Sequence, residues 1–137
     1  MKAISLYQPY ASLIASGKKT IETRCWATRY RGDLLIASTL KPVVAGLPLG
    51  QALCIVEIFD CMPMRPYHEA DACCKWYEGA WAWMLRNIRA IEPFAIKGGR
   101  GFYEVAIPAP TALAGTLTVL DQIMYSRSAG TFVNRKS

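Results

Sequence analysis

The 137-residue sequence lacks the features that define several large protein classes. It has no apolar run close to the ~20 residues that cross a bilayer, and its start, MKAISLYQPY, has no signal-peptide core. Its five cysteines form no C-x-x-C pair and it has one histidine, so neither a disulfide framework nor a zinc site is expected. We therefore expect a cytoplasmic protein without membrane contact, metal or other cofactor.

Histidine chemistry is equally scarce. The single His68 stands at a predicted helix start, where capping is more typical than catalysis. No Ser-His-Asp or Cys-His arrangement can be assembled with any specificity, so the sequence indicates no catalytic residues of those kinds.

Acidic residues are also few, with 10 Asp and Glu against 16 Lys and Arg, a formal net charge of +6. A basic surface attracts polyanions, which favours a nucleic-acid partner. The apolar fraction of 53% suffices for a folded core, and the length suits one domain. Patterning weakens after Pro108, which predicts a domain over 1–110 and an extension over 111–137, docked to about residue 125 and mobile beyond.

The hydrophobic pattern predicts short strands interrupted by two helices. Strands are expected over 2–7, 20–26, 34–37, 51–61, 80–91 and 102–108, with Pro93 closing the fifth. One helix follows Pro9 and ends at Gly17, and a shorter one lies within 68–77. Glycine and proline mark a loop at 40–50 and a turn at 97–101. Together these elements predict an α+β fold, a small mixed β-barrel of about six strands with two short flanking helices.

The most charged short stretch is GKKTIETR, at residues 17–24. Glu22 and Arg24 are two apart on a predicted strand, so their side chains share a face ~6–7 Å apart, and Lys19 at its entrance can join them. This cluster offers cations to a phosphate and a carboxylate to the amino group of a base. The alternative is a solvated turn with an exposed ion pair, a common and weakly stabilising feature.

Aromatic side chains near these cations would supply faces on which bases stack. By strand parity Trp26 lies on the face of Glu22 and Arg24 and is the preferred stacking residue, with core packing equally compatible. Trp81 and Trp83 share a strand face and are expected in the core, because they bury so much area. The remaining aromatic candidates are Tyr7, Tyr10, Tyr30 and Tyr103.

Two further regions supply candidate binding residues. The turn at 97–101, KGGRG, places Lys97 and Arg100 beside glycines whose backbone amides a ligand can approach, although a flexible hairpin connection explains it as well. Glu57 lies among apolar residues of a strand, where burial would raise its pKa unless a cation pairs with it. We expect that cation to come from the 17–24 stretch.

Four segments, in order, resemble the ASCH family, named for homology to the activating signal cointegrator. The family signature G-x-K-x-x-E-x-R reads here Gly17, Lys19, Glu22 and Arg24. Later segments that resemble the family are GLPLGQALCIVEIFDC, AWAWMLRNIRAIEP and IKGGRGFYEV, so the resemblance covers roughly residues 2–108. It implies the PUA-like fold, a β-barrel with flanking helices shared with domains that bind RNA and recognise modified bases. The cleft is then expected where the signature meets the barrel rim.

The resemblance also bears on catalysis. Some short ASCH relatives are amidohydrolases of acetylcytidine that use a lysine and a threonine of the signature, and some family members are linked to RNA cleavage. Lys19 matches that lysine, but Glu22 occupies the place of the threonine. A carboxylate does not replace a hydroxyl nucleophile, so a binding module is favoured over an enzyme.

The sequence thus predicts a module that binds RNA, single-stranded nucleic acid or a modified nucleoside in a basic cleft. The alternative is a nucleoside-amide hydrolase or a ribonuclease that uses Lys19 and Glu22. A protein partner docked on the apolar segment 112–124 is a third interpretation. The candidate site residues are Lys19, Glu22, Arg24, Trp26, Glu57, Lys97 and Arg100.

Overall fold

The computed structural model describes residues 1–108 of the chain. Its strands are β1 (Lys2–Leu6), β2 (Ile21–Arg24), β3 (Gly32–Ser38), β4 (Gln51–Pro63), β5 (Trp81–Ala95) and β6 (Tyr103–Glu104). Its helices are α1 (Tyr10–Ala15) and α2 (Glu69–Ala72), the second preceded by a 3-10 turn, η1 (Pro66–His68). Within this part of the chain, no helix has the length and apolar character needed to cross a bilayer.

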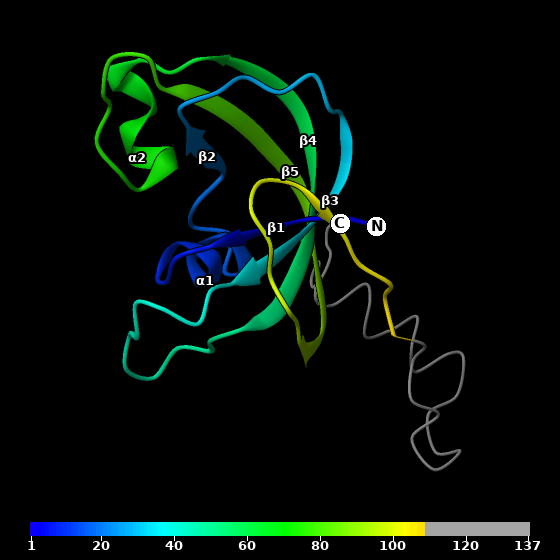
Figure 1. Ribbon diagram of the computed structural model, residues 1–137. Helices are drawn as coiled ribbons and strands as arrows, with labels where there is room; N and C mark the ends of the chain where they lie inside the picture. Colours follow the sequence, from blue (N-terminus) through cyan, green and yellow to red (C-terminus); the bar gives the residue numbers. More distant parts are fainter. Residues whose placement is uncertain (109–137) are drawn as a thin grey trace.

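The strands form one six-stranded mixed sheet in the order β2-β5-β4-β3-β1-β6 (Figure 1). The pair β1–β3 is parallel and the other neighbouring pairs are antiparallel. Figure 1 shows β4 and β5 as long, bent strands, and register shifts along their ladder accompany this curvature. The predicted α+β class is confirmed, with six strands and two short helices.

The sheet of residues 1–108 is not closed into a barrel, which differs from the prediction. Its edge strands are β2 and β6, and they do not pair with each other. β6 has two residues and covers only Lys2 and Ala3 of β1, so in the described chain Ser5 and Leu6 have no strand on that side. β2 has only four residues, so both edge strands are short. They are too short to pair with each other and close the sheet, and an open seam separates β2 from β6.

The main core lies inside the curve of the sheet. Trp83 of β5 is fully buried there, as predicted, and Trp81 packs partly buried against the same cluster. α1 contributes Ala11 and Ile14 to this core, and its exit is made by Gly17, whose φ of +86° favours a residue without a side chain. α1 therefore holds the start of the signature close to the sheet.

A second, smaller core attaches the segment between β4 and β5. Met64 and Ala72 from this segment pack with Ile21 of β2 and Ala82 of β5. His68 is buried, and its Nδ1 accepts the backbone N–H of Arg65 at 3.0 Å, so this histidine caps η1 as expected. The segment forms a lobe, residues 64–80, that lies against β2.

Two predictions concern the end of β5 and the chain beyond residue 108. β5 continues through Pro93 to Ala95, so the prediction that Pro93 closes the strand is wrong. The β4–β5 register shifts between Ala52 and Cys54, which forms a bulge that tolerates a residue without an N–H. The predicted docked segment to residue 125 and the partner-binding segment 112–124 lie outside the described residues.

Candidate functional site

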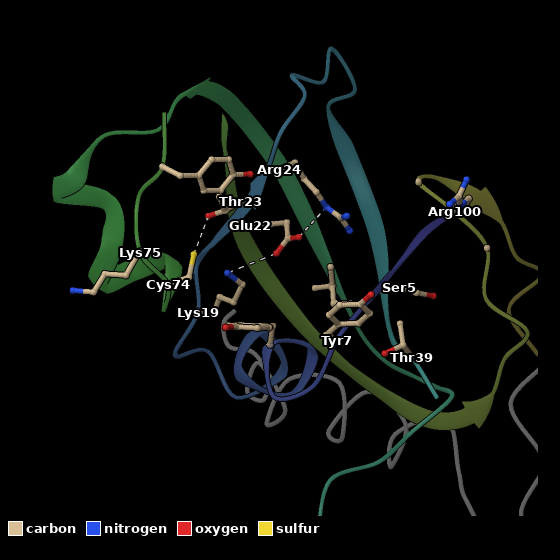
Figure 2. Close-up of a pocket in the computed structure, with 15 residues that line it drawn as sticks. Ser5, Tyr7, Lys19, Glu22, Thr23, Arg24, Thr39, Cys74, Lys75 and Arg100 are labelled. Atoms are coloured by element: carbon tan, nitrogen blue, oxygen red, sulfur yellow. Dashed lines mark hydrogen bonds and ion pairs between the residues drawn. The ribbon is translucent and has the colours of Figure 1, made fainter. Parts of the chain in front are cut away.

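A cleft of about 540 Å³ opens at the seam of the sheet (Figure 2). One wall is β2 together with the lobe, and the other is β1 together with the turn before β6. The floor comes from the start of α1. The lining residues are Ser5, Leu6, Tyr7, Tyr10, Lys19, Glu22, Thr23, Arg24, Thr39, Cys74, Lys75, Tyr77, Gly99, Arg100 and Gly101.

Lys19 is the most buried cation of the cleft, with 2% of its side chain exposed. Its backbone N–H donates to the carbonyl of Leu13 at 3.0 Å, which ties it to the end of α1. Its ammonium donates to the carbonyl oxygen of Ala72, lies 3.6 Å from Glu22 Oε1, and sits 5.4 Å from the centre of the Tyr10 ring. The ammonium therefore joins α1, β2 and the last turn of α2.

Glu22 lies between Lys19 and Arg24, as Figure 2 shows. Its side chain is 8% exposed, and Arg24 Nε lies 2.9 Å from its Oε2. Burial raises the pKa of Glu22 above its usual value, and the charges of Lys19 and Arg24 oppose that effect. The two oxygens of the Glu22 carboxylate each contact a cation, Lys19 at Oε1 and Arg24 at Oε2. Removing these charges from water costs desolvation free energy, which the ion pairs offset only in part.

Arg24 has donors left over for a ligand. Its Nε pairs with Glu22 by distance only, since the N–H is not aligned for a hydrogen bond, and its terminal nitrogens bond no other group in residues 1–108. Figure 2 shows the guanidinium directed from β2 into the cleft. Lys75 and Arg100 are exposed on the lining and, unlike Arg24, have no ionic partner in residues 1–108. The cleft thus presents three cations with donors that can meet an anion.

The structure brings Lys19, Glu22, Arg24 and Arg100 of the predicted site into one cleft. Lys97 lies on the same turn as Arg100 but does not line the cavity. The glycines of this turn do line it, with Gly99 and Gly101 exposing backbone on the side of Arg100.

Trp26 does not line the cleft, so its expected place beside Glu22 and Arg24 is wrong. Strand parity fails because β2 ends at Arg24, two residues earlier. Trp26 packs edge-on against Trp83 and Phe102, with ring centres 4.7 and 5.6 Å away, and its carbonyl accepts the indole N–H of Trp83. Its ring therefore packs on the rim of the core, with 37% of the residue still exposed, which is closer to the packing alternative that the sequence left open.

Glu57 is also placed elsewhere, so the expectation that it pairs with the 17–24 stretch is wrong. In the β4–β5 ladder it stands opposite Arg86, and Arg86 donates to its Oε2 at 3.0 Å. Its side chain is 28% exposed, so it does not experience the fully buried environment that was expected.

Several lining residues were not predicted from the sequence. Tyr77, Cys74 and Lys75 come from the lobe, and their signal was the interleaving of cation and aromatics in Lys75-Trp76-Tyr77. Thr23 is next to Glu22 on β2, so strand alternation predicts that its side chain points to the other face, yet it lines the cavity beside the lobe. Its Oγ1 lies 3.3 Å from Cys74 Sγ.

Of the aromatic candidates, Tyr7 and Tyr10 are the two that reach the cleft. Tyr7 is 62% exposed, so its ring is available to a ligand. Within residues 1–108, no three side chains of the metal-binding kinds gather closely enough to hold an ion.

The open mixed sheet, with a basic and partly aromatic cleft at its seam, defines a PUA-like α+β protein. The chain belongs to the ASCH domain family, whose model matches residues 4–95. The resemblance found in the sequence is thereby confirmed, and the family as a whole is RNA-binding-like in character.

Similarity to individual proteins agrees with this assignment. The chain is 50% identical over 88 residues to the human (Homo sapiens) Activating signal cointegrator 1, a match covering 48% of this chain and 15% of that protein. The mouse (Mus musculus) protein is 32% identical over 88 residues, with the same coverage. The matched region is thus a small part of both relatives, and their whole-protein activities do not carry over from it.

Two solved structures of a protein from Zymomonas mobilis have a similar fold. The ASCH protein of Zymomonas mobilis superimposes with a TM-score of 0.60 at 19% identity, covering 77% of this chain and 87% of that one. A mutant form of the same Zymomonas mobilis protein gives a TM-score of 0.56 at 18% identity, covering 77% of this chain and 89% of that one. At this identity the likeness establishes the fold alone.

Proposed function

We propose that this protein binds RNA or another single-stranded nucleic acid, including modified nucleotides, in the cleft at its signature. The observation that carries the proposal is the guanidinium of Arg24, held at the cleft by the buried carboxylate of Glu22 with its terminal donors unused within residues 1–108. A planar guanidinium with two free N–H groups suits a phosphate, which it can bind through two parallel hydrogen bonds.

The other cleft residues support the same ligand class. Tyr7 offers an exposed ring for a base, and the Glu22 carboxylate can accept from a base amino or imino group. The lining carries Lys19, Arg24, Lys75 and Arg100 against the single carboxylate of Glu22, so the cleft is positive. The Lys19 ammonium is already engaged with Glu22 and the carbonyl of Ala72. Lys19 therefore stabilises the site by holding Glu22 in place.

The test is a titration of labelled single-stranded RNA by fluorescence anisotropy at several salt concentrations. We expect affinity to fall as salt rises, with the shallow slope of a few phosphate contacts. Arg24→Lys keeps the charge but loses the planar fork, and should weaken binding roughly tenfold, or about 1.4 kcal/mol. Arg29→Lys is the matched control, because Arg29 is exposed and lies off the cleft.

Flat titrations with single-stranded RNA, single-stranded DNA and modified nucleosides would overturn the proposal. So would an Arg24→Lys protein that binds as tightly as the Arg29→Lys control, because the guanidinium would then have no part in recognition.

The catalytic alternative has one observation in its favour, the raised pKa of a carboxyl group in a cleft, which is typical of general acids and bases. Against it, a lysine acting as base needs a free lone pair, whereas Lys19 donates to Ala72 and contacts Glu22. Incubation with acetylcytidine and with labelled RNA separates the two functions. Product formation that Glu22→Gln abolishes would favour the hydrolase or ribonuclease.

A further inference from the structure

We propose that a second groove, which shares a wall with the cleft, binds a further base of the same nucleic-acid strand by stacking it on Trp76. The proposal rests on the proposed function and extends its site beyond the cleft. The groove, called here the lobe groove, has a volume of about 340 Å³. Its lining includes Met64, Arg65, Trp76, Glu78, Ala80 and Trp81.

The wall between the cleft and the lobe groove is the stretch Lys75-Trp76-Tyr77. Lys75 and Tyr77 line the cleft, whereas Trp76 lines the lobe groove. Two residues of chain span at most about 7 Å, so the three side chains leave the backbone close to one another. Figure 2 shows the Lys75 side chain directed outward, away from the cleft. A strand that leaves the cleft over this wall therefore passes the Lys75 ammonium and meets the Trp76 ring.

Trp76 presents a fixed aromatic ring with no unused polar group. Its indole N–H donates to the carbonyl of Met64 at 2.9 Å, and its backbone N–H donates to Glu69 Oε2 at 2.7 Å. The residue is nevertheless 37% exposed. A base can stack on such a ring whatever its sequence, and little order has to be gained, because the ring is already held.

The floor of the lobe groove is preformed and apolar. Met64 and Ala80 are 1% and 3% exposed, and the backbone N–H of Met64 donates to the carbonyl of Ala80 at 2.9 Å. Both residues belong to the small core that attaches the lobe to β2 and β5, and Figure 1 shows the lobe with α2 beside β2. The groove is therefore part of the folded domain.

Two charged side chains lie on the lining of the lobe groove. Arg65 and Glu78 are exposed, and neither has an ion-pair partner in residues 1–108. A guanidinium can bind a phosphate, and a carboxylate can accept from a base amino group. Because the two charges cancel, the lobe groove attracts a polyanion less than the positive cleft does. Its contribution to affinity should therefore come mainly from stacking.

The experiment measures binding of oligoadenylates of one to six nucleotides to the full chain by calorimetry. We expect the affinity to rise about tenfold at the length that reaches the lobe groove, since stacking one base on an aromatic ring contributes that much. Trp76→Ala should remove this increase. The same variant should bind the mononucleotide as the wild type does, because the mononucleotide occupies the cleft alone.

Tryptophan fluorescence provides a second measurement with a matched control. Trp26 is also 37% exposed and lines neither the cleft nor the lobe groove. The hexanucleotide should quench the fluorescence of the wild type and of Trp26→Phe. Trp76→Phe should lose most of this quenching and keep most of the affinity, because phenylalanine still offers a ring for stacking.

Four results would overturn this proposal. They are an affinity that does not rise with length, equal hexanucleotide binding by Trp76→Ala and Trp26→Phe, quenching that persists in Trp76→Phe, and equal weakening of mononucleotide and hexanucleotide in Trp76→Ala. The last would mean that the ring acts only by holding the lobe.

The same measurements separate this proposal from the proposed function. If any of these results is found while RNA binding still depends on Arg24, the proposed function stands and only the role of the lobe groove is wrong. The groove would then suit a protein segment instead. If neither the mononucleotide nor the hexanucleotide binds, both proposals are wrong.

Discussion

Glu22 is the residue at which burial and charge conflict most strongly in this protein. Its carboxylate is nearly enclosed, yet Lys19 and Arg24 hold it on both oxygens. Burial is the largest effect on its pKa, which is raised from the usual 4.5. The same ion pair orients the Arg24 guanidinium. The desolvation cost of burying Glu22 therefore accompanies the placement of the group that we propose meets the ligand.

The raised pKa of Glu22 predicts how stability depends on pH. A carboxyl whose native pKa exceeds its unfolded pKa contributes stability below the unfolded value, and that contribution is lost as pH rises through the native value. Glu22→Gln cannot lose a proton. Its free energy of unfolding should therefore rise relative to wild type as pH increases across that window.

Urea unfolding of both proteins over a pH series measures this difference, and carboxyl NMR locates the native pKa directly. A constant difference between the two proteins, or a native pKa at or below 4.5, would contradict the prediction.

The sequence predicted this cluster correctly because its three members are within six residues of one another. Lys19, Glu22 and Arg24 are brought together by a helix end and a short strand, both of which have strong local signals. Glu57 shows the converse. Its partner Arg86 is 29 residues away on another strand, and only the register of the β4–β5 ladder determines that they meet.

At the scale of elements, Lys19 also connects β2 to α2. Its ammonium donates to the carbonyl of Ala72, and the neighbouring N–H of Thr20 donates to the carbonyl of Asp71 at 2.9 Å. These bonds hold the lobe against the edge strand. The lobe in turn supplies Cys74, Lys75 and Tyr77 to the cleft.

Replacing Lys19 should therefore loosen this junction. Lys19→Met leaves Glu22 without one buried cation and the Ala72 carbonyl without its donor, so we expect a loss of about 3–5 kcal/mol in the free energy of unfolding. Lys18→Met, at the exposed neighbour, should change it by less than about 0.5 kcal/mol. Urea unfolding compares them.

A double variant, Lys19→Met with Glu22→Gln, removes the uncompensated charge and should recover part of the loss. Similar stabilities of Lys19→Met and Lys18→Met would show that the buried ion pair does not hold the lobe.

Strand and helix positions followed from local patterns, whereas strand ends did not. β5 passes through Pro93 because a bulge in its ladder with β4 accommodates the missing N–H. β2 stops at Arg24, and Trp26 beyond it packs against Trp83 at the rim of the core and does not line the cleft. Both outcomes depend on the neighbouring strand, which a single segment of sequence does not specify.

At the scale of the whole molecule, residues 1–108 contain an apolar core. Its three clusters of apolar side chains draw on residues between Ala3 and Val105. The cleft residues likewise lie between Ser5 and Gly101. The domain predicted over 1–110 should then contain what folding and binding require.

A fragment ending at residue 110 tests this expectation. We expect it to unfold in one cooperative transition, with an RNA affinity within about threefold of the full chain, because residues between Ser5 and Gly101 line the described cleft. Thermal unfolding followed by circular dichroism, together with the anisotropy titration, gives both values. A fragment that is unfolded, or that has lost its affinity, would assign the extension to the domain itself.

The sequence by itself determined the α+β class, the order of the elements and the cluster of Lys19, Glu22 and Arg24, because each depends on contacts or periodicity within a short stretch. Only the tertiary structure decided that the sheet stays open and that its seam is the cleft. It also selected Tyr7, Tyr77 and Lys75 as lining residues in place of Trp26 and Glu57. The reason is physical: which side chains share a cavity depends on where strands end and how their ladders align, and those are properties of residues far apart in the chain.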